Sequence, residues 1–405
     1  MNARTALAML AAFMAAVPLA AKAQTPFPND TVKVGVLTDM SGPFADQVGA
    51  GSVAAARLAA EDFNTEGGKL KAEIVFGDHQ NKPDVGVNIA RQWVDLDGVA
   101  AIVDLPNSGV ALAVSNMMKE KNRATLASGA ATSDLTGRAC APTTVQWVMD
   151  TWAQGHSTAK IMTERHLDTW FFLTVDYALG LALERDATAA LVADGGKVLG
   201  AVRSPLGTSD FSSPLLQAQS SGAKVIVLAN TGADAINAVK QAAEFGIGRK
   251  GTQIASLFVQ ISDIHSLGLA TAQGLELTTG FYWDNNDDTR AFAKRFAARM
   301  GGRMPTEDHA GAYAATLAYL HAAAITNTME GDKTIEQMKK MPIHDKLFGT
   351  ETVRQDGRAI HPMDVFRVKA PAESKGPYDY YTKIASIPAD QAFRPLSEGG
   401  CSFVK

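Results

Sequence analysis

Residues 32–44 have the sequence VKVGVLTDMSGPF, and this stretch decides the fold class. The apolar, mostly β-branched run at 32–37 predicts a buried strand, and the Ser-Gly-Pro that follows predicts a loop. Residues 51–64 then carry apolar side chains at helical spacing, including Leu58 and Phe63. A strand followed by a loop and a helix is the unit from which parallel α/β sheets are built.

This unit recurs in two series along the chain, before and after Trp147. The last part differs: residues 365–368 and 380–387 alternate as antiparallel strands do, with Pro and Gly between them. The other expected strands are 71–77, 100–103, 124–127, 169–175, 197–202, 224–228 and 253–257, and the other expected helices are 83–95, 110–121, 156–165, 179–193, 211–220, 233–245, 288–300, 309–328 and 335–340.

The first residues have the pattern of an export signal. Arg4 supplies a positive charge, residues 5–20 form an apolar run, and residues 21–23, Ala-Lys-Ala, match a small-x-small cleavage motif. We expect cleavage near Ala23, so that the mature chain begins near Gln24. A membrane anchor is the alternative, but the run is short for a span of about 20 residues. No Cys follows Ala23, so a lipid anchor is not expected.

The charge and the length of the chain limit which classes of protein it can belong to. The net charge is −4, and the charged residues are interspersed without a basic run, so we do not expect a nucleic-acid-binding protein. No later stretch has the length and hydropathy of a membrane span. A chain of 405 residues is long enough for two domains of ordinary size.

Cys140 and Cys401 are the two cysteines of the chain. An exported protein meets an oxidising compartment, and an even number of cysteines there predicts a disulfide. Two buried free thiols are the alternative. Two cysteines without clustered histidines do not make a zinc site, and we expect no metal and no cofactor.

Residues 34–44, followed by Ala-Glu-Asp-Phe-Asn at 60–64, resemble the opening of type I periplasmic binding proteins. The most similar group is the leucine/isoleucine/valine-binding family of ABC transporter components. The resemblance covers nearly the whole mature chain. It continues through Asn107-Ser108-Gly109, Ser128-Gly129-Ala130-Ala131, Asp176-Tyr177-Ala178-Leu179-Gly180 and Asp210-Phe211.

The resemblance implies an α/β fold of two Rossmann-like lobes joined by three crossings. These would lie near residues 145–151, 278–282 and 349–353. Lobe one would comprise 24–146 plus 280–350, and lobe two 147–279 plus 351–405. The implied function is capture of a small molecule in the periplasm by lobe closure, with delivery to ABC permease subunits in the inner membrane. The expected state is a monomer.

Ligands of open α/β sheets lie beyond the carboxyl ends of the strands. Two loops of lobe one meet this condition, one with Asn107 and Ser108 and one with Ser128, Gly129 and Ala130. Free N–H groups and hydroxyls at a helix start favour an anion. In the resembled family these two loops hold the ligand's carboxylate. Ordinary helix capping is the alternative role for the Ser and Asn residues.

Lobe two supplies the opposite wall. Tyr177 and Phe258 would cover an apolar ligand body, while Asn230 and its neighbour Thr231 offer donors and acceptors. Core packing is the alternative for both aromatic residues. Two further candidates for the wall are Phe44, which matches a family position, and Trp152, for which hinge packing is the alternative.

Amino-acid binders of this family use an acidic residue and a Tyr of lobe two to hold the α-ammonium group. Asp263 lies near the expected loop but is no unambiguous match. A hydrophobic amino acid and an aromatic or other hydrophobic carboxylate therefore both remain expected ligands, and a short amide is a further option.

Motifs for catalysis are lacking in the sequence. Residues 49–54 fit a loose G-x-G-x-x-A pattern, but a long loop separates them from the preceding strand, which argues against a dinucleotide site. No G-x-S-x-G, Walker A or H-E-x-x-H sequence occurs. We expect no enzymatic activity. A periplasmic sensor of the same fold is the alternative, and an amide hydrolase a weaker one.

Overall fold

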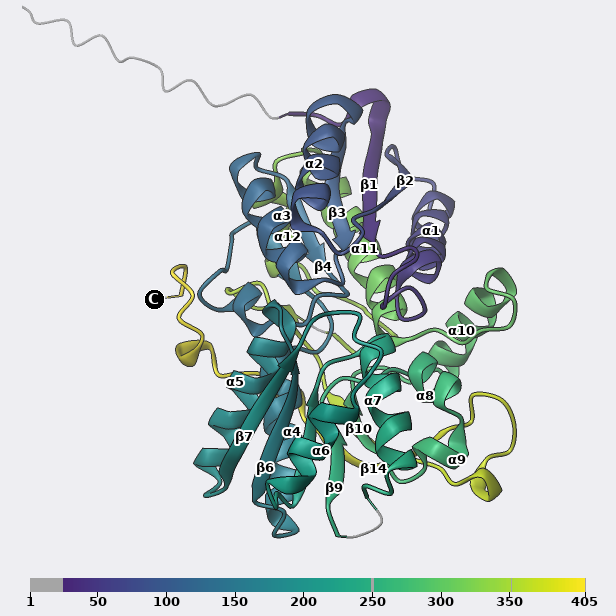
Figure 1. The fold of residues 1–405 in the computed structure, drawn as a ribbon. Helices are drawn as coiled ribbons and strands as arrows, with labels where there is room; N and C mark the ends of the chain where they lie inside the picture. The colour runs from purple at the N-terminus through teal and green to yellow at the C-terminus, as the bar shows by residue number, and fades with distance from the viewer. Residues whose placement is uncertain (1–24, 249–250, 351, 405) are drawn as a thin grey trace, which may run out of the picture.

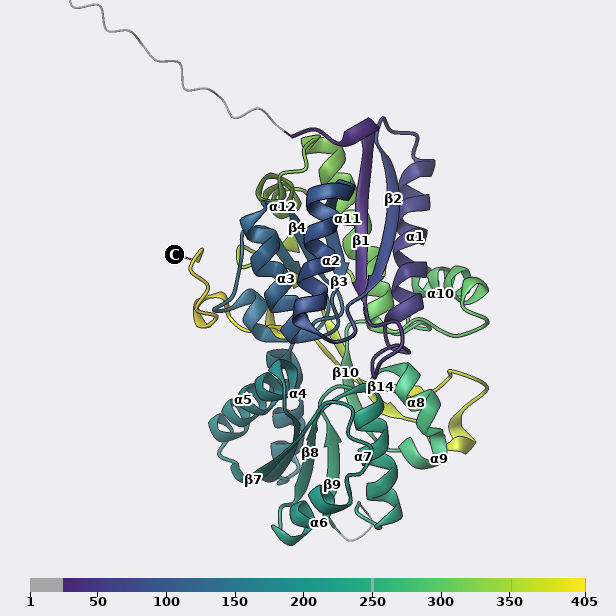
Figure 2. The same ribbon diagram turned by 45° about the horizontal axis from the view of Figure 1, so that its top comes forward.

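The computed structural model describes residues 25–248, 251–350 and 352–404. The expected export signal and its cleavage site at Ala23 lie outside the described residues. Two parallel sheets lie at opposite ends of the molecule, each in a lobe of its own, and several chain segments run between the lobes (Figures 1 and 2). None of the helices in the described ranges is long and apolar enough to cross a membrane.

Lobe one is built on a five-stranded parallel sheet of order β2-β1-β3-β4-β5. Its strands are β1 (Thr31–Thr38), β2 (Lys71–Asp78), β3 (Val99–Asp104), β4 (Ala124–Ala127) and β5 (Thr144–Gln146). Its helices are α1 (Gly49–Thr65), α2 (Pro83–Gln92), α3 (Ser108–Glu120), α10 (Asp287–Arg299), α11 (Glu307–Thr326) and α12 (Gly331–Lys340), with shorter turns at η1 (Pro28–Asp30), η2 (Trp93–Asp97) and η3 (Ser133–Thr136).

β1 shows why this sequence forms the centre of the sheet. Val34 and Val36 face one hydrophobic cluster, and Leu37 faces the other, as the two-residue period of a strand requires. Gly35 makes room for the ring of Trp93, since a Cβ at this position would lie 2.4 Å from Trp93 Cζ3. Both faces are therefore buried along residues 34–38, and residues 34–37 are all apolar, whereas Thr31 and Lys33 near the start of the strand are half-buried.

Lobe two contains a four-stranded parallel sheet of order β7-β6-β8-β9 and an antiparallel sheet of order β10-β13-β14. The strands are β6 (Thr169–Val175), β7 (Lys197–Ser204), β8 (Val225–Ala229), β9 (Gln253–Ser256), β10 (Glu276–Thr279), β13 (Met363–Val368) and β14 (Tyr381–Ile387). The helices are α4 (Thr151–Glu164), α5 (Ala178–Ala193), α6 (Ser212–Ser220), α7 (Gly232–Glu244), α8 (Ile261–Leu267), α9 (Leu269–Ala272) and α13 (Ala389–Ala392), with a turn at η4 (Pro371–Glu373). The turn η5 (Leu396–Glu398) lies in the C-terminal segment that follows this lobe.

The predicted α/β class and the alternation of strands and helices are confirmed, with differences at the ends of elements. The helix expected at 83–95 ends at Gln92 and continues as the π-helical turn η2, which stops at Gly98 with a positive φ of 72°. The helix expected from residue 156 starts at Thr151, because the Asp150 carboxylate caps it by accepting from Ala153 N at 2.9 Å.

A short hairpin of β11 (Thr352–Val353) and β12 (Ala359–Ile360) was not predicted. Val353 and Ala359 pack in the hydrophobic cluster of lobe one, and Arg358 forms a parallel bridge with Gln146 at the end of β5. The Arg358 side chain is fully buried and pairs with Asp150 at 3.4 Å, so this hairpin is fixed beside the first crossing between the lobes.

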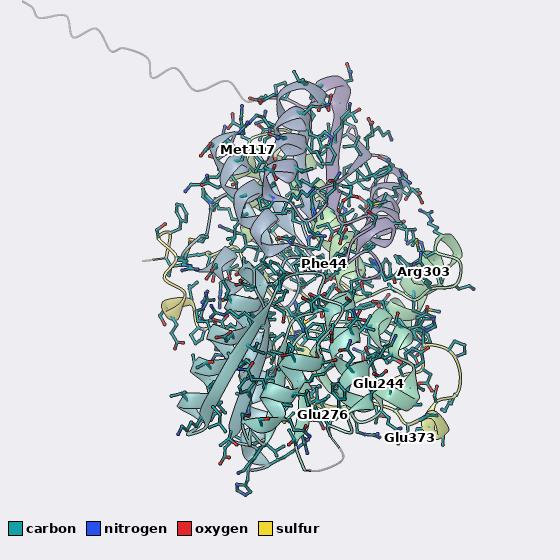
Figure 3. All side chains as sticks on the ribbon, viewed as in Figure 1. Phe44, Met117, Glu244, Glu276, Arg303 and Glu373 are labelled. Atoms are coloured by element: carbon teal, nitrogen blue, oxygen red, sulfur yellow. A yellow bond between two sulfur atoms is a disulfide. The ribbon has the colours of Figure 1, made fainter. Side chains whose placement is uncertain are left out.

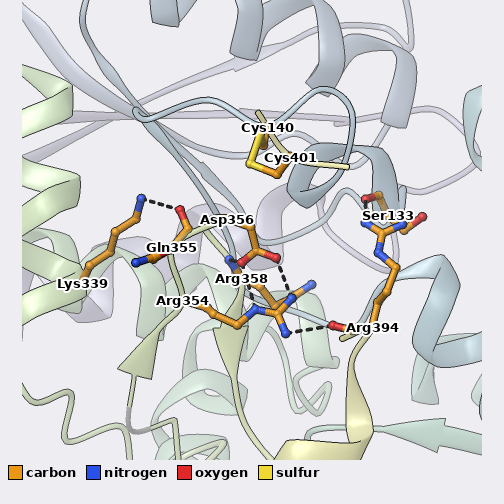
Figure 4. Close-up of a disulfide and its surroundings, with 9 residues drawn as sticks. All are labelled: Ser133, Cys140, Lys339, Arg354, Gln355, Asp356, Arg358, Arg394 and Cys401. Atoms are coloured by element: carbon orange, nitrogen blue, oxygen red, sulfur yellow. Dashed lines mark hydrogen bonds and ion pairs between the residues drawn. A yellow bond between two sulfur atoms is a disulfide. The ribbon is translucent and has the colours of Figure 1, made fainter. Parts of the chain in front are cut away.

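The predicted disulfide between Cys140 and Cys401 is present, with Cα atoms 5.6 Å apart (Figure 4). Cys140 precedes β5 of lobe one, whereas Phe393, shortly before Cys401, packs in a hydrophobic cluster of lobe two. Arg394 donates to Ser133 O at 2.9 Å and reinforces the same connection. The C-terminal segment therefore ties lobe two back to lobe one beside the hinge.

Candidate functional site

The loop after β1 reaches from lobe one to lobe two. The buried Asp39 carboxylate holds it, because Oδ1 accepts from Gly42 N at 2.7 Å and Oδ2 from Phe44 N at 3.0 Å. Asn81 Nδ2 also donates to Asp39 at 2.9 Å. These bonds fix the loop so that Phe44 lies where the two lobes meet (Figure 3).

Phe44 is 2% exposed and lies 6.4 Å from the ring of Tyr177 in lobe two. The same loop contacts the start of α7, where Ala233 N donates to Pro43 O at 3.2 Å. Gly232 permits this approach, since its φ is +60° and a Cβ would lie 2.4 Å from Pro43 O. The backbones of the two lobes are therefore in direct contact.

Side chains also join the lobes at this point. Gln47 Nε2 donates to Thr231 Oγ1 at 2.9 Å and to Asp263 Oδ2 at 2.7 Å. Glu307 N, at the start of α11, donates to Gln260 Oε1 at 3.2 Å. All five residues are buried, so these interactions hold the lobes together away from water.

The expected carboxylate wall of lobe one contains both structural and unpartnered groups. Asn107 caps α3, with Oδ1 accepting from Gly109 N and Val110 N, so the capping role holds for this residue. Ala130 O accepts from Gln146 Nε2 at 2.9 Å. The hydroxyl groups of Ser108 and Ser128 are buried and have no hydrogen-bond partner within the described ranges.

The wall of lobe two is similar. Asn230 Oδ1 and the Tyr177 hydroxyl are buried and lack a partner among the described residues. Burial raises the pKa of Tyr177 well above its usual range, so the phenol is a neutral donor. Phe258 packs in a hydrophobic cluster of this lobe. Trp152 instead stacks on His156, with ring centroids 3.7 Å apart, in the first turns of α4.

A small cavity of about 10 Å³ lies between the two walls. Four residues expected from the sequence line it: Phe44, Gly129, Thr231 and Phe258. The other five were not among the expected site residues, although Ala131 and Leu179 belong to the family motifs quoted above; the five are Gln47, Pro106, Ala131, Leu179 and Asp308. The remaining expected residues are not among the lining residues in the described part of the chain; these are Asn107, Ser108, Ser128, Ala130, Trp152, Tyr177 and Asn230.

Buried carboxyl groups surround this cavity. Burial raises the pKa of Asp263 to about 7, although Gln260 N and Gln47 donate to it. Burial also raises the pKa of Asp104 to about 7, and the Asp104 carboxyl lies behind Gly129, whose Cβ would be 2.6 Å from Oδ1. The pKa of Asp308 is raised well above its usual range by burial and by neighbouring carboxyls. The wall expected to hold a carboxylate is therefore itself acidic.

Asp308 lies within a capping box at the start of α11, and this is why the sequence did not identify it as a site residue. Thr306 Oγ1 accepts from His309 N at 3.2 Å, and His309 Nδ1 accepts from Thr306 N at 3.1 Å. An acidic residue next to such a cap is common at a helix start, because its negative charge interacts favourably with the positive end of the helix dipole. Nothing in the local sequence distinguishes Asp308 from that role. Within the described ranges, no group of three or more His, Cys, Asp or Glu is placed to hold a metal ion.

The two lobes each contain a parallel sheet, and they meet around a cavity beyond the carboxyl ends of the strands. This arrangement is that of a two-lobed solute-binding protein. The chain belongs to the periplasmic binding protein family, whose model matches residues 31–377. The family resemblance inferred from residues 34–44 and the later motifs is thereby confirmed.

Three comparisons illustrate the relationship. A periplasmic binding protein from Burkholderia mallei has a solved structure 43% identical to this chain, with a TM-score of 0.89, covering 93% of this chain and 100% of that one. A branched chain amino acid ABC transporter periplasmic ligand-binding protein from Burkholderia xenovorans LB400 is 40% identical, with a TM-score of 0.81, covering 92% and 100%. The Leu/Ile/Val-binding protein homolog 6 of Brucella melitensis is 28% identical over 322 residues, or 77% of this chain and 81% of the relative.

Proposed function

We propose that this protein is the solute-binding component of an ABC importer. It captures a small carboxylate-bearing solute, a hydrophobic amino acid or an aromatic acid, and delivers it to permease subunits in the inner membrane. It acts in the periplasm as a monomer without catalysis, after cleavage of an export signal near Ala23. The name of the Burkholderia xenovorans relative supports the transport role.

The observation that carries this proposal is the cavity between the lobes. Apolar side chains of both lobes, Phe44, Leu179 and Phe258, line it and suit an apolar ligand body. At about 10 Å³ the space holds no more than a water in this closed form, so the lobes must part to admit a solute. The hydroxyl groups of Ser108, at the start of α3 beyond β3, and of Ser128, in the loop beyond β4, have no partner among the described residues and suit a carboxylate. Asn107, Gly129 and Ala130 shape that wall, and Tyr177, Asn230 and Thr231 form the opposite one.

We assign lobe one to residues 25–146 plus 280–360 and lobe two to 147–279 plus 361–393. The third crossing is placed after β12, later than the 349–353 expected from the sequence, because Val353 and Ala359 pack with lobe one. Ligand binds to one lobe while the lobes are apart, and closure then forms the contacts of Phe44 and Gln47 around it. The permease recognises the closed form.

A thermal-shift screen of the mature protein tests the proposal. The panel contains branched-chain and aromatic amino acids, benzoate and related aromatic acids, and short amides. We expect a concentration-dependent rise in melting temperature with one class, because a ligand that binds only the folded state stabilises it. Isothermal titration calorimetry then gives the affinity and stoichiometry. A panel in which no compound raises the melting temperature would reject this ligand class.

A further inference from the structure

Asp308 brings a carboxyl group to the cavity between the lobes. It lies in the first turn of α11, is 2% exposed, and lines the cavity with Phe44, Gly129 and Thr231. Within the described ranges its Oδ1 has no hydrogen-bond partner. A buried carboxyl oxygen without a partner is costly, which points to a group that the ligand supplies.

Two of the other carboxyls in this region have hydrogen-bond partners. Glu307 accepts from Met149 N at 3.1 Å and from Thr279 Oγ1 at 2.6 Å. Asp263 accepts from Gln47 and from the backbone of α8. Asp104 has no partner for either oxygen among the described residues, but it lies behind Gly129 and does not line the cavity. Asp308 is the one ionisable side chain among the described residues that line the cavity.

The electrostatic surroundings of Asp308 are acidic. Burial has the largest effect and raises its pKa, and the charges of Glu307, Asp104 and Asp263 each raise it further, while the side chain of Gln260, a hydrogen-bond donor beside the carboxyl, lowers it. A ligand with a carboxylate and no positive charge would add another negative charge to a poorly solvated site. A ligand with a cationic group would instead give the Asp308 carboxylate an opposite charge at short range.

We propose that Asp308 binds a cationic group of the ligand, so that the site selects amine-bearing solutes over carboxylates of the same shape. This inference rests on the proposed function and chooses between its two ligand classes. The acidic partner comes from α11 of lobe one, whereas in the sequence Asp263 of lobe two lay near the expected loop without being an unambiguous match. Ser108 and Ser128 remain available for the carboxylate of a zwitterionic ligand.

Matched ligand pairs test the selection directly. L-leucine is compared with 4-methylpentanoate, and L-phenylalanine with 3-phenylpropanoate, by isothermal titration calorimetry on the mature protein. The members of each pair differ by the amine alone. We expect the amine-bearing member of the better pair to bind at least about tenfold more tightly.

Variants of Asp308 test whether this residue causes the preference for the amine-bearing ligand. Asp308→Asn keeps the shape of the side chain but removes the charge, and it should bind both members of the pair with affinities within about threefold of each other. Asp308→Glu keeps the charge and should retain the preference. Asp84→Asn is the matched control, because Asp84 is exposed in the first turn of α2 and shares the helix-start position. Circular dichroism confirms that each variant is folded.

The outcomes separate this inference from the proposed function. Equal binding of amino acids and their deaminated analogues by the unaltered protein would overturn the role of Asp308 and leave a carboxylate receptor. A preference that persists in Asp308→Asn would also overturn it. Failure of every pair to bind would overturn this inference, while the thermal-shift panel, which also contains benzoate and related aromatic acids, decides separately whether the proposed ligand class stands.

Discussion

Gln47 of lobe one donates from Nε2 to Asp263 Oδ2 of lobe two, with 2.7 Å between the two atoms. The same nitrogen lies 2.9 Å from Thr231 Oγ1. Gln47, Thr231 and Asp263 are each less than 5% exposed, so water does not compete for these bonds. The bonds exist only when the lobes meet, and they therefore stabilise the closed form relative to the open one.

Replacement of Gln47 by alanine tests this contribution. Gln47→Ala removes both hydrogen bonds between the lobes and should raise the Kd of the best ligand about tenfold, since each bond contributes about 0.5–1.5 kcal/mol. Titration calorimetry measures the change. Gln92→Ala, at an exposed position at the end of α2, is the control and should leave Kd unchanged. Equal affinities of the Gln47→Ala and unaltered proteins would contradict a role in closure.

A substitution at Gly232 tests directly whether the two lobes must close on the ligand. A Cβ at this position would lie 2.4 Å from Pro43 O, so Gly232→Ala should hold the lobes apart and raise Kd about tenfold to a hundredfold. Small-angle X-ray scattering should show a larger radius of gyration with ligand present than the unaltered protein has. Gly222→Ala is the control, because its φ of +73° brings the same backbone strain without a neighbour within 4 Å. Matching effects of the two substitutions would attribute the change to strain.

The pH dependence of stability follows from Asp263. Its pKa is raised by burial to about 7, against about 4 in an unfolded chain. Between these values the folded protein holds a proton that the unfolded chain releases. The free energy of unfolding therefore decreases as the pH rises from about 4 to about 7.

Asp263→Asn should remove this part of the slope. The variant keeps the acceptor, because one oxygen, Oδ2, accepts from both Gln47 and Gln260 N. Relative to the unaltered protein it should gain on the order of 2 kcal/mol in unfolding free energy between about pH 5 and about pH 7.5. Urea unfolding across that range measures the difference, with Asp84→Asn as the control. Parallel pH profiles of the two proteins would contradict the raised pKa.

The disulfide should contribute strongly to stability. Cys401→Ser opens a covalent loop with a sequence separation of 261 and should lower the free energy of unfolding by about 2–5 kcal/mol. Differential scanning calorimetry measures it, and Cys140→Ser should give the same loss as the double variant. An unchanged melting temperature in Cys401→Ser would show that the contacts of Arg394 fix the C-terminal segment without the bond.

The sequence predicted the elements whose pattern is local and strong. The apolar run around Val34 and Val36 is long enough to identify β1 without knowledge of its neighbours. Some strands are too short to show the two-residue period of a strand: β5 has three residues, and β11 and β12 have two each. These strands form only because they pair with other strands.

The sequence could predict those site residues that follow directly after a strand of a parallel sheet. Gly129 and Thr231 follow parallel strands, and their place near the cavity follows from the topology of the sheets. Asp308 and Gln47 carry no such mark, because they gain their roles from packing between segments far apart in the sequence. Trp152 shows the converse, since its aromatic character suggested a binding wall whereas its ring stacks on His156. The ligand-binding roles of all these residues remain predictions for the variants above.

The bond between Cys140 and Cys401 also changes what a single break in the backbone does to this molecule. Every peptide bond of lobe two lies between these residues, so the lobe forms part of one covalent ring. A protease that cuts one exposed loop within the ring leaves a single molecule, which migrates as two fragments only after reduction. The protein can therefore be cut once within this ring without losing lobe two.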